Sequence, residues 1–151
     1  PIPMAELVQL PFAQVDAFSS KPFSGNPAAV VGMGQFQAYL PDSILQAIAA
    51  ENNLSETAFW LEDSGGNEDE FTGRLRWFTP TLEIDLCGHA TIATAHVVFS
   101  SRPSARRALF KTMSGTLEVV RGMDGRYEMA LPSWRLPAAG SAAGPGAVLL
   151  A

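Results

Sequence analysis

The 151-residue sequence predicts an α+β domain in which many short strands are combined with two helices. Short apolar or alternating runs recur along the chain, and turn residues such as Gly, Asn and Asp separate them. Only two segments have the spacing of apolar residues that a helix requires. Strands and helices do not alternate regularly, which argues against a repeated βαβ pattern.

The first part of the chain contains two expected strands and one expected helix. Range 11–18 alternates as a strand does, and 28–31 is a short apolar strand that follows the turn Gly25-Asn26-Pro27. Range 43–51 repeats its apolar residues on one helical face, so it predicts a helix. Asn52-Asn53 after it is typical of a left-handed helix end.

Five further strands are expected, and the last three form a meander. Asp124-Gly125, between two strand-like runs, is a strong signal for a hairpin. The predicted strands cover 55–61, 74–78, 108–112, 116–121 and 126–131.

The second helix is expected over 88–99 and differs from a surface helix. It is small and apolar on all sides, with Ala90, Ala93, Ala95 and Val97 distributed around its circumference. A helix without a polar face is buried. We therefore expect it at the centre of the domain.

The composition divides the chain into an ordered domain over 1–132 and a terminal segment over 133–151. Pro, Gly and Ala dominate this segment, which reads as a linker. Its last five residues resemble the first turn of a helix, so we interpret them as the truncated start of a second domain.

Charge and cysteine content narrow the class of protein. A net charge of −5 and a pI near 4.9 argue against a nucleic-acid partner, since phosphate binding needs clustered Lys and Arg. The single cysteine, Cys87, excludes an internal disulfide and fits a reducing cytoplasm. No signal peptide or run of ~20 apolar residues is visible, so no membrane association is expected.

The segment Asn53-Leu54-Ser55-Glu56-Thr57 places a carboxylate where a strand begins. Proton abstraction needs a positioned base, and Glu56 is a candidate because its sequence neighbours are mostly apolar. The alternative is an exposed strand residue or part of a turn. The sequence leaves both interpretations open.

Cys87-Gly88-His89 lies where the central helix should begin. The first N–H groups of a helix lack internal partners and bind carboxylates readily. Gly88 lets a ligand approach the backbone, and His89 is a potential donor or acid near neutral pH. The alternative is a buried helix start with a structural His. Likewise Cys87 is either a nucleophile or base, or a small buried hydrophobic residue.

Two further residues were considered as ligand contacts. Asn26 has an amide to offer a ligand, although its segment is most simply a turn. His96 follows His89 by seven residues on the same helical face, but two His without a third ligand do not make a metal site. We therefore expect neither metal nor cofactor.

Several segments together resemble the PhzF-like, phenazine-biosynthesis-like family of isomerases within the diaminopimelate epimerase-like fold. The resemblance spans about 14–131 and is specific as a combination. Its segments are Val15-Asp16-Ala17-Phe18, Phe23-Ser24-Gly25-Asn26-Pro27-Ala28-Ala29-Val30, Asn53-Leu54-Ser55-Glu56-Thr57-Ala58-Phe59, Arg76-Trp77-Phe78-Thr79-Pro80 and Leu86-Cys87-Gly88-His89-Ala90-Thr91.

The resemblance implies cofactor-independent isomerase or epimerase chemistry on a small carboxylated substrate. The family fold has two similar halves, each a curved mixed or antiparallel, barrel-like sheet around a central helix, with the active site between them. By this resemblance Glu56 is the general acid/base, Gly88 and His89 hold the substrate carboxylate, and Asn26 lines the substrate. Cys87 falls where related amino-acid epimerases carry a catalytic thiol.

The resemblance also implies that this chain corresponds to the N-terminal half only. The second half of the family fold supplies an acidic partner and a second carboxylate-binding loop. One interpretation is therefore an isomerase that is incomplete as this chain alone. The alternative is a non-catalytic half-domain that binds a small ligand or associates with itself. The expected partner is a second copy, giving a homodimer, or the missing C-terminal half.

Overall fold

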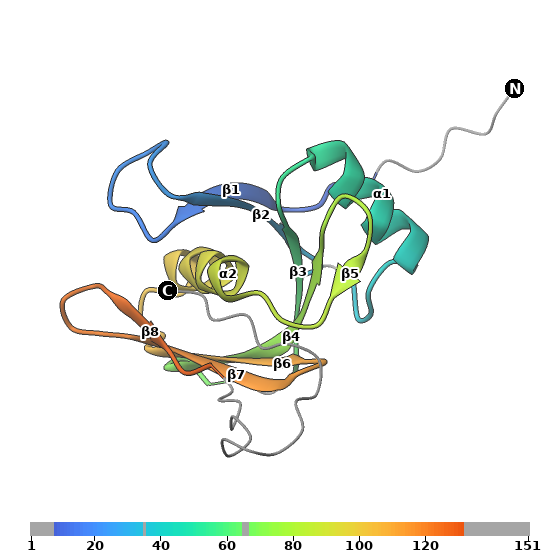
Figure 1. The fold of residues 1–151 in the computed structure, drawn as a ribbon. Coiled ribbons are helices and arrows are strands. Elements are labelled where there is room, and N and C mark those ends of the chain that lie inside the picture. The colour runs from blue at the N-terminus through green and yellow to red at the C-terminus, as the bar shows by residue number, and fades with distance from the viewer. Residues whose placement is uncertain (1–7, 35, 65–66, 132–151) are drawn as a thin grey trace, which may run out of the picture.

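The computed structural model describes residues 8–34, 36–64 and 67–131 (Figure 1). The predicted linker and domain start over 133–151 lie outside the described residues. Within the described ranges, eight strands and two helices follow one another along the chain. They are β1 (Phe12–Ala17), β2 (Asn26–Gly32), α1 (Asp42–Asn52), β3 (Thr57–Glu62), β4 (Glu70–Phe78), β5 (Glu83–Ile84), α2 (Gly88–Ser101), β6 (Arg107–Thr112), β7 (Gly115–Arg121) and β8 (Tyr127–Met129).

The strands form one mixed sheet. Its order is β1-β2-β3-β4-β6-β7-β8, and β5 pairs with β4 beside this path. The pairs β2/β3 and β4/β6 are parallel, and the other neighbours are antiparallel. Parallel neighbours need a crossover connection. Here α1 connects β2 to β3, and α2 lies in the connection from β4 to β6.

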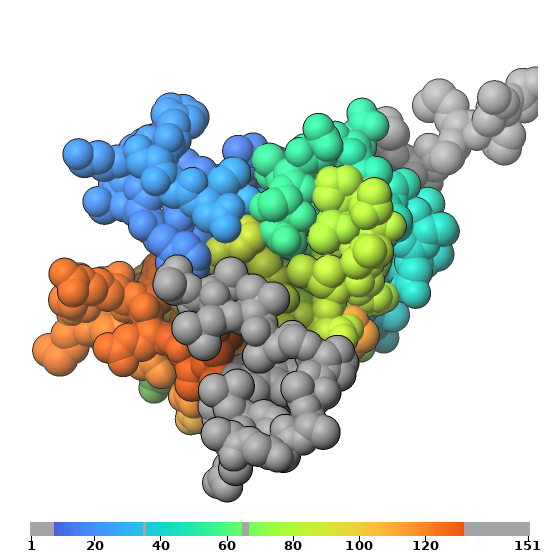
Figure 2. Space-filling model, viewed as in Figure 1, coloured from blue at the N-terminus to red at the C-terminus, as the bar shows by residue number. Residues whose placement is uncertain are grey.

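The sheet curls around α2, and α1 packs on its outer side (Figure 1). Alternate residues of β4 therefore enter two cores: Leu75 and Trp77 pack in the inner core around α2, and Phe78 packs in the outer core with Leu45 of α1. Figure 2 shows α2, in yellow, at the bottom of a recess between the β1–β2 hairpin and the β3 region. The predicted α+β class, with a curved mixed sheet around a central helix, is confirmed.

Small side chains allow α2 to lie inside the sheet. Ala90, Ala93 and Ala95 are fully buried. Thr91 and Thr94 are also fully buried, and their hydroxyls donate to the helix carbonyls of Cys87 (2.5 Å) and Ala90 (2.7 Å). Satisfying each hydroxyl within the helix removes the cost of burying it. The expected central, buried helix is confirmed.

The structure corrects several predicted boundaries. Asn26 and Pro27 belong to β2, where they pair with Ala17 and Asp16 of β1, and are not part of the turn. β4 begins at Glu70, four residues before the predicted start. Its first four residues alternate between partly buried and buried in phase with the rest of the strand, and they pair with β6. The two-residue β5 was not expected, and β8 is shorter than the predicted 126–131.

Neither helix in the described part of the chain is long and apolar enough to cross a membrane.

Candidate active site

The turn between α1 and β3 fixes the position of Glu56. Asn53 ends α1 in the left-handed conformation (φ 49°), as predicted, and its N–H donates to the carbonyl of Ala49 at 3.2 Å. The Asn52 amide donates to the hydroxyl of buried Thr57 at 3.2 Å. On the other side, the Ala29 N–H of β2 donates to the Glu56 carbonyl at 3.1 Å. The Glu56 backbone is therefore held from both sides.

The start of α2 provides the second part of the site. Cys87 is the N-cap residue, with extended backbone (φ −143°), and no side chain caps the helix. No acidic residue lies in the first helical turn to complement its N–H groups. A Cβ added at Gly88 would meet only the Met129 Cε within 4 Å, at an ordinary contact distance of 3.6 Å. Among the described residues a side-chain methyl would thus fit at Gly88 without a clash, and its absence leaves room for a ligand to approach the backbone of the helix start.

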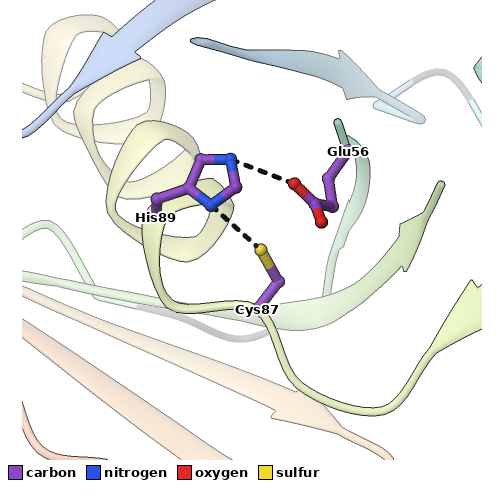
Figure 3. A group of neighbouring side chains, drawn as sticks. All are labelled: Glu56, Cys87 and His89. Carbon is purple, nitrogen blue, oxygen red and sulfur yellow. Dashed lines mark hydrogen bonds and ion pairs between the residues drawn. The ribbon is translucent and has the colours of Figure 1, made fainter. Parts of the chain in front are cut away.

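The structure brings Glu56, Cys87 and His89 together (Figure 3). His89 Nε2 lies 3.2 Å from Glu56 Oε2, and His89 Nδ1 lies 3.4 Å from the Cys87 sulfur. The imidazole thus faces the carboxylate with one nitrogen and the thiol with the other (Figure 3). The side chains are largely buried, with 10% of His89 and 17% of Glu56 exposed.

The contact between His89 and Glu56 is close but poorly aligned. Both Nε2 and Oε2 are buried, and neither has a hydrogen-bond partner of regular geometry in the described residues. Burying such groups without partners costs about 1–3 kcal/mol each, and more when they are charged. Catalytic hydrogen bonds are often misaligned until substrate is bound. The pair is therefore placed to act on a third group, which would supply the missing partners.

The Cys87 thiol is protonated at neutral pH. Burial raises its pKa from 9.0 to about 11, and the nearby Glu56 carboxylate acts in the same direction. The N–H groups of Ala90 and His89 oppose this rise without cancelling it. A thiolate is the nucleophilic form of cysteine. In this state, therefore, the chemistry of the cluster is centred on Glu56 and His89.

The same three residues offer a set of donors that Zn²⁺ accepts. One donor atom from each lies within 4.8 Å of the others, and sulfur, imidazole and carboxylate are all zinc ligands. However, the ring directs Nδ1 to the thiol and Nε2 to the carboxylate. Neither nitrogen therefore makes a close contact with both of the other donors. The geometry suits proton transfer better than coordination by three ligands.

The other candidates, Asn26 and His96, lie outside this cluster. Asn26 is exposed at the start of β2. Because β2 and β3 are parallel, this start lies at the same end of the two strands as Glu56, which directly precedes β3. His96 is exposed, and its Nδ1 lies 3.0 Å from the Tyr127 hydroxyl. It lines a separate groove of about 410 Å³ with Lys21 and Ile92. Figure 2 shows an open notch between the β1–β2 hairpin and the β8 region.

Sequence reasoning missed two residues that position the site, Asn52 and Thr57. Both lie within segments that the sequence analysis names, but without a role there, and the signal is a short polar side chain on each side of the left-handed turn. Their pairing depends on how the chain returns from α1 into β3, which no local pattern specifies.

Comparison with known proteins identifies the family. The family model described as phenazine biosynthesis-like protein, PhzC-PhzF, matches residues 15–146. An uncharacterized isomerase of Pseudomonas aeruginosa is 47% identical over 127 residues, which are 83% of this chain and 45% of that protein. The human phenazine biosynthesis-like domain-containing protein is 42% identical over 78% of this chain and 41% of its own length.

Similar solved structures point to the same family. A putative phenazine biosynthesis PhzC/PhzF protein from Clostridium difficile has a TM-score of 0.70 at 43% identity, covering 80% of this chain and 43% of that one. A predicted epimerase from Pseudomonas aeruginosa has a TM-score of 0.58 at 27% identity, covering 77% and 40%. This chain spans less than half the length of these relatives. Matched over most of its length, it belongs to the phenazine biosynthesis-like PhzC-PhzF family.

Proposed function

We propose that this chain carries the acid/base half of a cofactor-independent isomerase site that acts on a small carboxylate. The observation that carries the proposal is the buried Glu56–His89 contact of 3.2 Å, which lacks regular hydrogen-bond partners, beside the open start of α2. The isomerase and epimerase names of relatives support the reaction class.

In the proposed reaction Glu56 is the base. Its carboxylate takes a proton from a substrate carbon next to a carbonyl or carboxylate, and the electron pair of the broken C–H bond moves onto the substrate oxygen. The N–H groups at the start of α2, with His89, stabilise that negative charge. Glu56 then returns the proton to another carbon on the same face; protonation of the opposite face would need an acid from the second half. The cycle consumes no oxidant and leaves the enzyme unchanged.

The proposed substrate is a small carboxylate because the site offers anion-binding groups and open space at Gly88. The helix N-terminus is uncapped, and a Cβ at Gly88 would not clash with protein atoms. Asn26, on the same sheet edge as Glu56, is proposed to contact the substrate from the β2 side. Cys87 completes the lining through its contact with His89.

We further propose that a second half completes the site, in a homodimer or in a longer chain. Two large aromatic side chains in the β1–β2 connection support an interaction surface: Phe18 is 74% exposed and Phe23 is 99% exposed. Exposed apolar side chains of this size mark interaction sites when they cluster.

Light scattering at several concentrations tests the pairing. We expect the chain of 16.1 kDa to approach twice that mass as its concentration rises. A mass of 16.1 kDa throughout would contradict self-pairing.

Solvent-deuterium incorporation tests the function before the substrate is known. The chain is incubated in D₂O with small carboxylates that carry a C–H bond next to the carboxyl or carbonyl group, and NMR detects exchange. Exchange of one such compound, absent with heat-denatured chain, is expected. Binding of a carboxylate without exchange, by a chain that light scattering shows to be paired, would contradict the isomerase proposal and favour the alternative, a ligand-binding half-domain.

A further inference from the structure

The thiol of Cys87 faces one ring nitrogen of His89, and Glu56 faces the other. The Cys87 sulfur lies 3.4 Å from Nδ1, within the range of a sulfur hydrogen bond. Nε2, the other ring nitrogen, lies 3.2 Å from Glu56 Oε2. A neutral imidazole carries a proton on one nitrogen and accepts at the other. The two neighbours therefore bear on which nitrogen of His89 holds the proton.

The thiol side favours an unprotonated Nδ1. A protonated thiol is a weak donor, and a donor facing Nδ1 needs a lone pair on that nitrogen. Cys87 is 6% exposed, and burial holds its pKa well above neutral pH, so the sulfur keeps its hydrogen.

The carboxylate side favours a protonated Nε2. An ionised carboxylate has acceptors only. If Nδ1 carried the proton, the lone pair of Nε2 would face a carboxylate oxygen at 3.2 Å, with both atoms buried. Two buried acceptors in contact repel each other and leave both without a partner. The contacts at both ring nitrogens thus favour the same tautomer, with the proton on Nε2.

We propose that Cys87 is a positioning residue, whose thiol donates to Nδ1 and holds neutral His89 as the tautomer protonated on Nε2. That tautomer presents an N–H at the side of the ring where Glu56 lies, and this N–H is the donor that the proposed reaction offers to the substrate oxygen. The catalytic consequence rests on the proposed function, but the tautomer itself does not.

NMR of the 151-residue chain tests the tautomer directly. The chain has two histidines, so His96→Gln leaves His89 as the only source of imidazole signals. Long-range ¹H–¹⁵N correlation at a pH where the ring is neutral should show a protonated Nε2 and an acceptor-type Nδ1. A protonated Nδ1, or a ring protonated on both nitrogens, would overturn the proposal.

Two substitutions of Cys87 test the role of the thiol. Cys87→Ala should shift the Nδ1 resonance towards that of a free acceptor nitrogen, whereas Cys87→Ser, which keeps an O–H donor, should not. In the exchange assay Cys87→Ala should slow turnover by up to about tenfold, the value of one hydrogen bond, and Cys87→Ser should restore it.

An Nδ1 resonance that stays unchanged in Cys87→Ala would show that the thiol does not hold the ring. A chain with the expected tautomer but no exchange activity would count against the proposed function only. The two proposals therefore fail separately.

Discussion

The three side chains of the cluster divide their tasks according to burial and position. Glu56 Oε2 and His89 Nε2 face each other, and neither has a regular hydrogen-bond partner in the described residues. The Cys87 sulfur contacts the other ring nitrogen, Nδ1. Because the thiol remains protonated, it is unsuited to act as the anionic nucleophile at neutral pH. The resemblance to epimerases that use a thiol at this position therefore does not require that Cys87 perform the same task here.

The raised pKa of Cys87 predicts a pH dependence of stability. Below about pH 9 the thiol is protonated in both folded and unfolded chains, so it contributes no pH dependence. Between about pH 9 and 11 the unfolded chain loses this proton and the folded chain retains it, so the free energy of unfolding falls as pH rises. The loss from this group should reach about 2 kcal/mol.

Urea unfolding of the native chain and of Cys87→Ser at pH 8 and pH 10.5 measures this loss. The serine variant is the control for other groups that titrate in the same range, among them Tyr39, whose pKa burial also raises. The difference in unfolding free energy between the two proteins should change with pH. A difference in unfolding free energy that is the same at pH 8 and pH 10.5 would show that the fold does not hold the thiol in its neutral form.

At the scale of elements, the end of α1 and the start of α2 position the groups that the proposed reaction uses. Each end was predicted from a few residues, because a left-handed Asn and a Cys-Gly-His helix start have local physical causes. Their meeting was not predictable from local pattern, since it depends on α2 lying inside the curled sheet. That arrangement was predictable only from the family resemblance and from the small side chains of α2, which are apolar on all sides of the helix.

Asn53 should be sensitive to substitution because of its left-handed backbone (φ 49°). Asn53→Ala should lower the free energy of unfolding by about 1 kcal/mol, whereas Asn53→Gly should be close to neutral. Chemical denaturation of both variants measures the difference. An alanine variant as stable as the glycine variant would mean that the turn before Glu56 relaxes without cost.

Gly88 should matter for the ligand and not for the fold. The methyl of Gly88→Ala meets only the Met129 Cε, at an ordinary contact distance of 3.6 Å, so the free energy of unfolding should change by less than about 0.5 kcal/mol. The exchange rate should fall about 10- to 100-fold because the carboxylate is displaced. Gly34→Ala, whose methyl meets no atom of the described residues within 4 Å, is the control outside the site. Unchanged exchange in Gly88→Ala would remove this helix end from the substrate site.

At the scale of the whole molecule, the element types were largely predictable and the pairing was not. Periodicity identified both helices and most strands, but β5 and the first residues of β4 depend on partners distant in sequence. For the same reason Asn26 was expected in a turn and lies in β2, where its register with Ala17 fixes it. Local patterns indicate burial and turn geometry, whereas strand order depends on pairing between segments that are distant in sequence.

The described part of the molecule brings Glu56 and His89 into contact at the start of its central helix, and the chain spans less than half of its relatives' length. The central claim is that this pair transfers protons on a carboxylate. Glu56→Gln preserves shape and removes the base. Glu51→Gln, on the exposed face of α1, makes the same chemical change outside the site.

Deuterium incorporation by these two variants, measured beside the native chain, tests the claim most directly. Glu56→Gln should slow exchange by ~10²–10⁴, the usual effect of losing a general base, and Glu51→Gln should match the native chain. Exchange by Glu56→Gln within about tenfold of the native rate would contradict the assignment of Glu56 as the base.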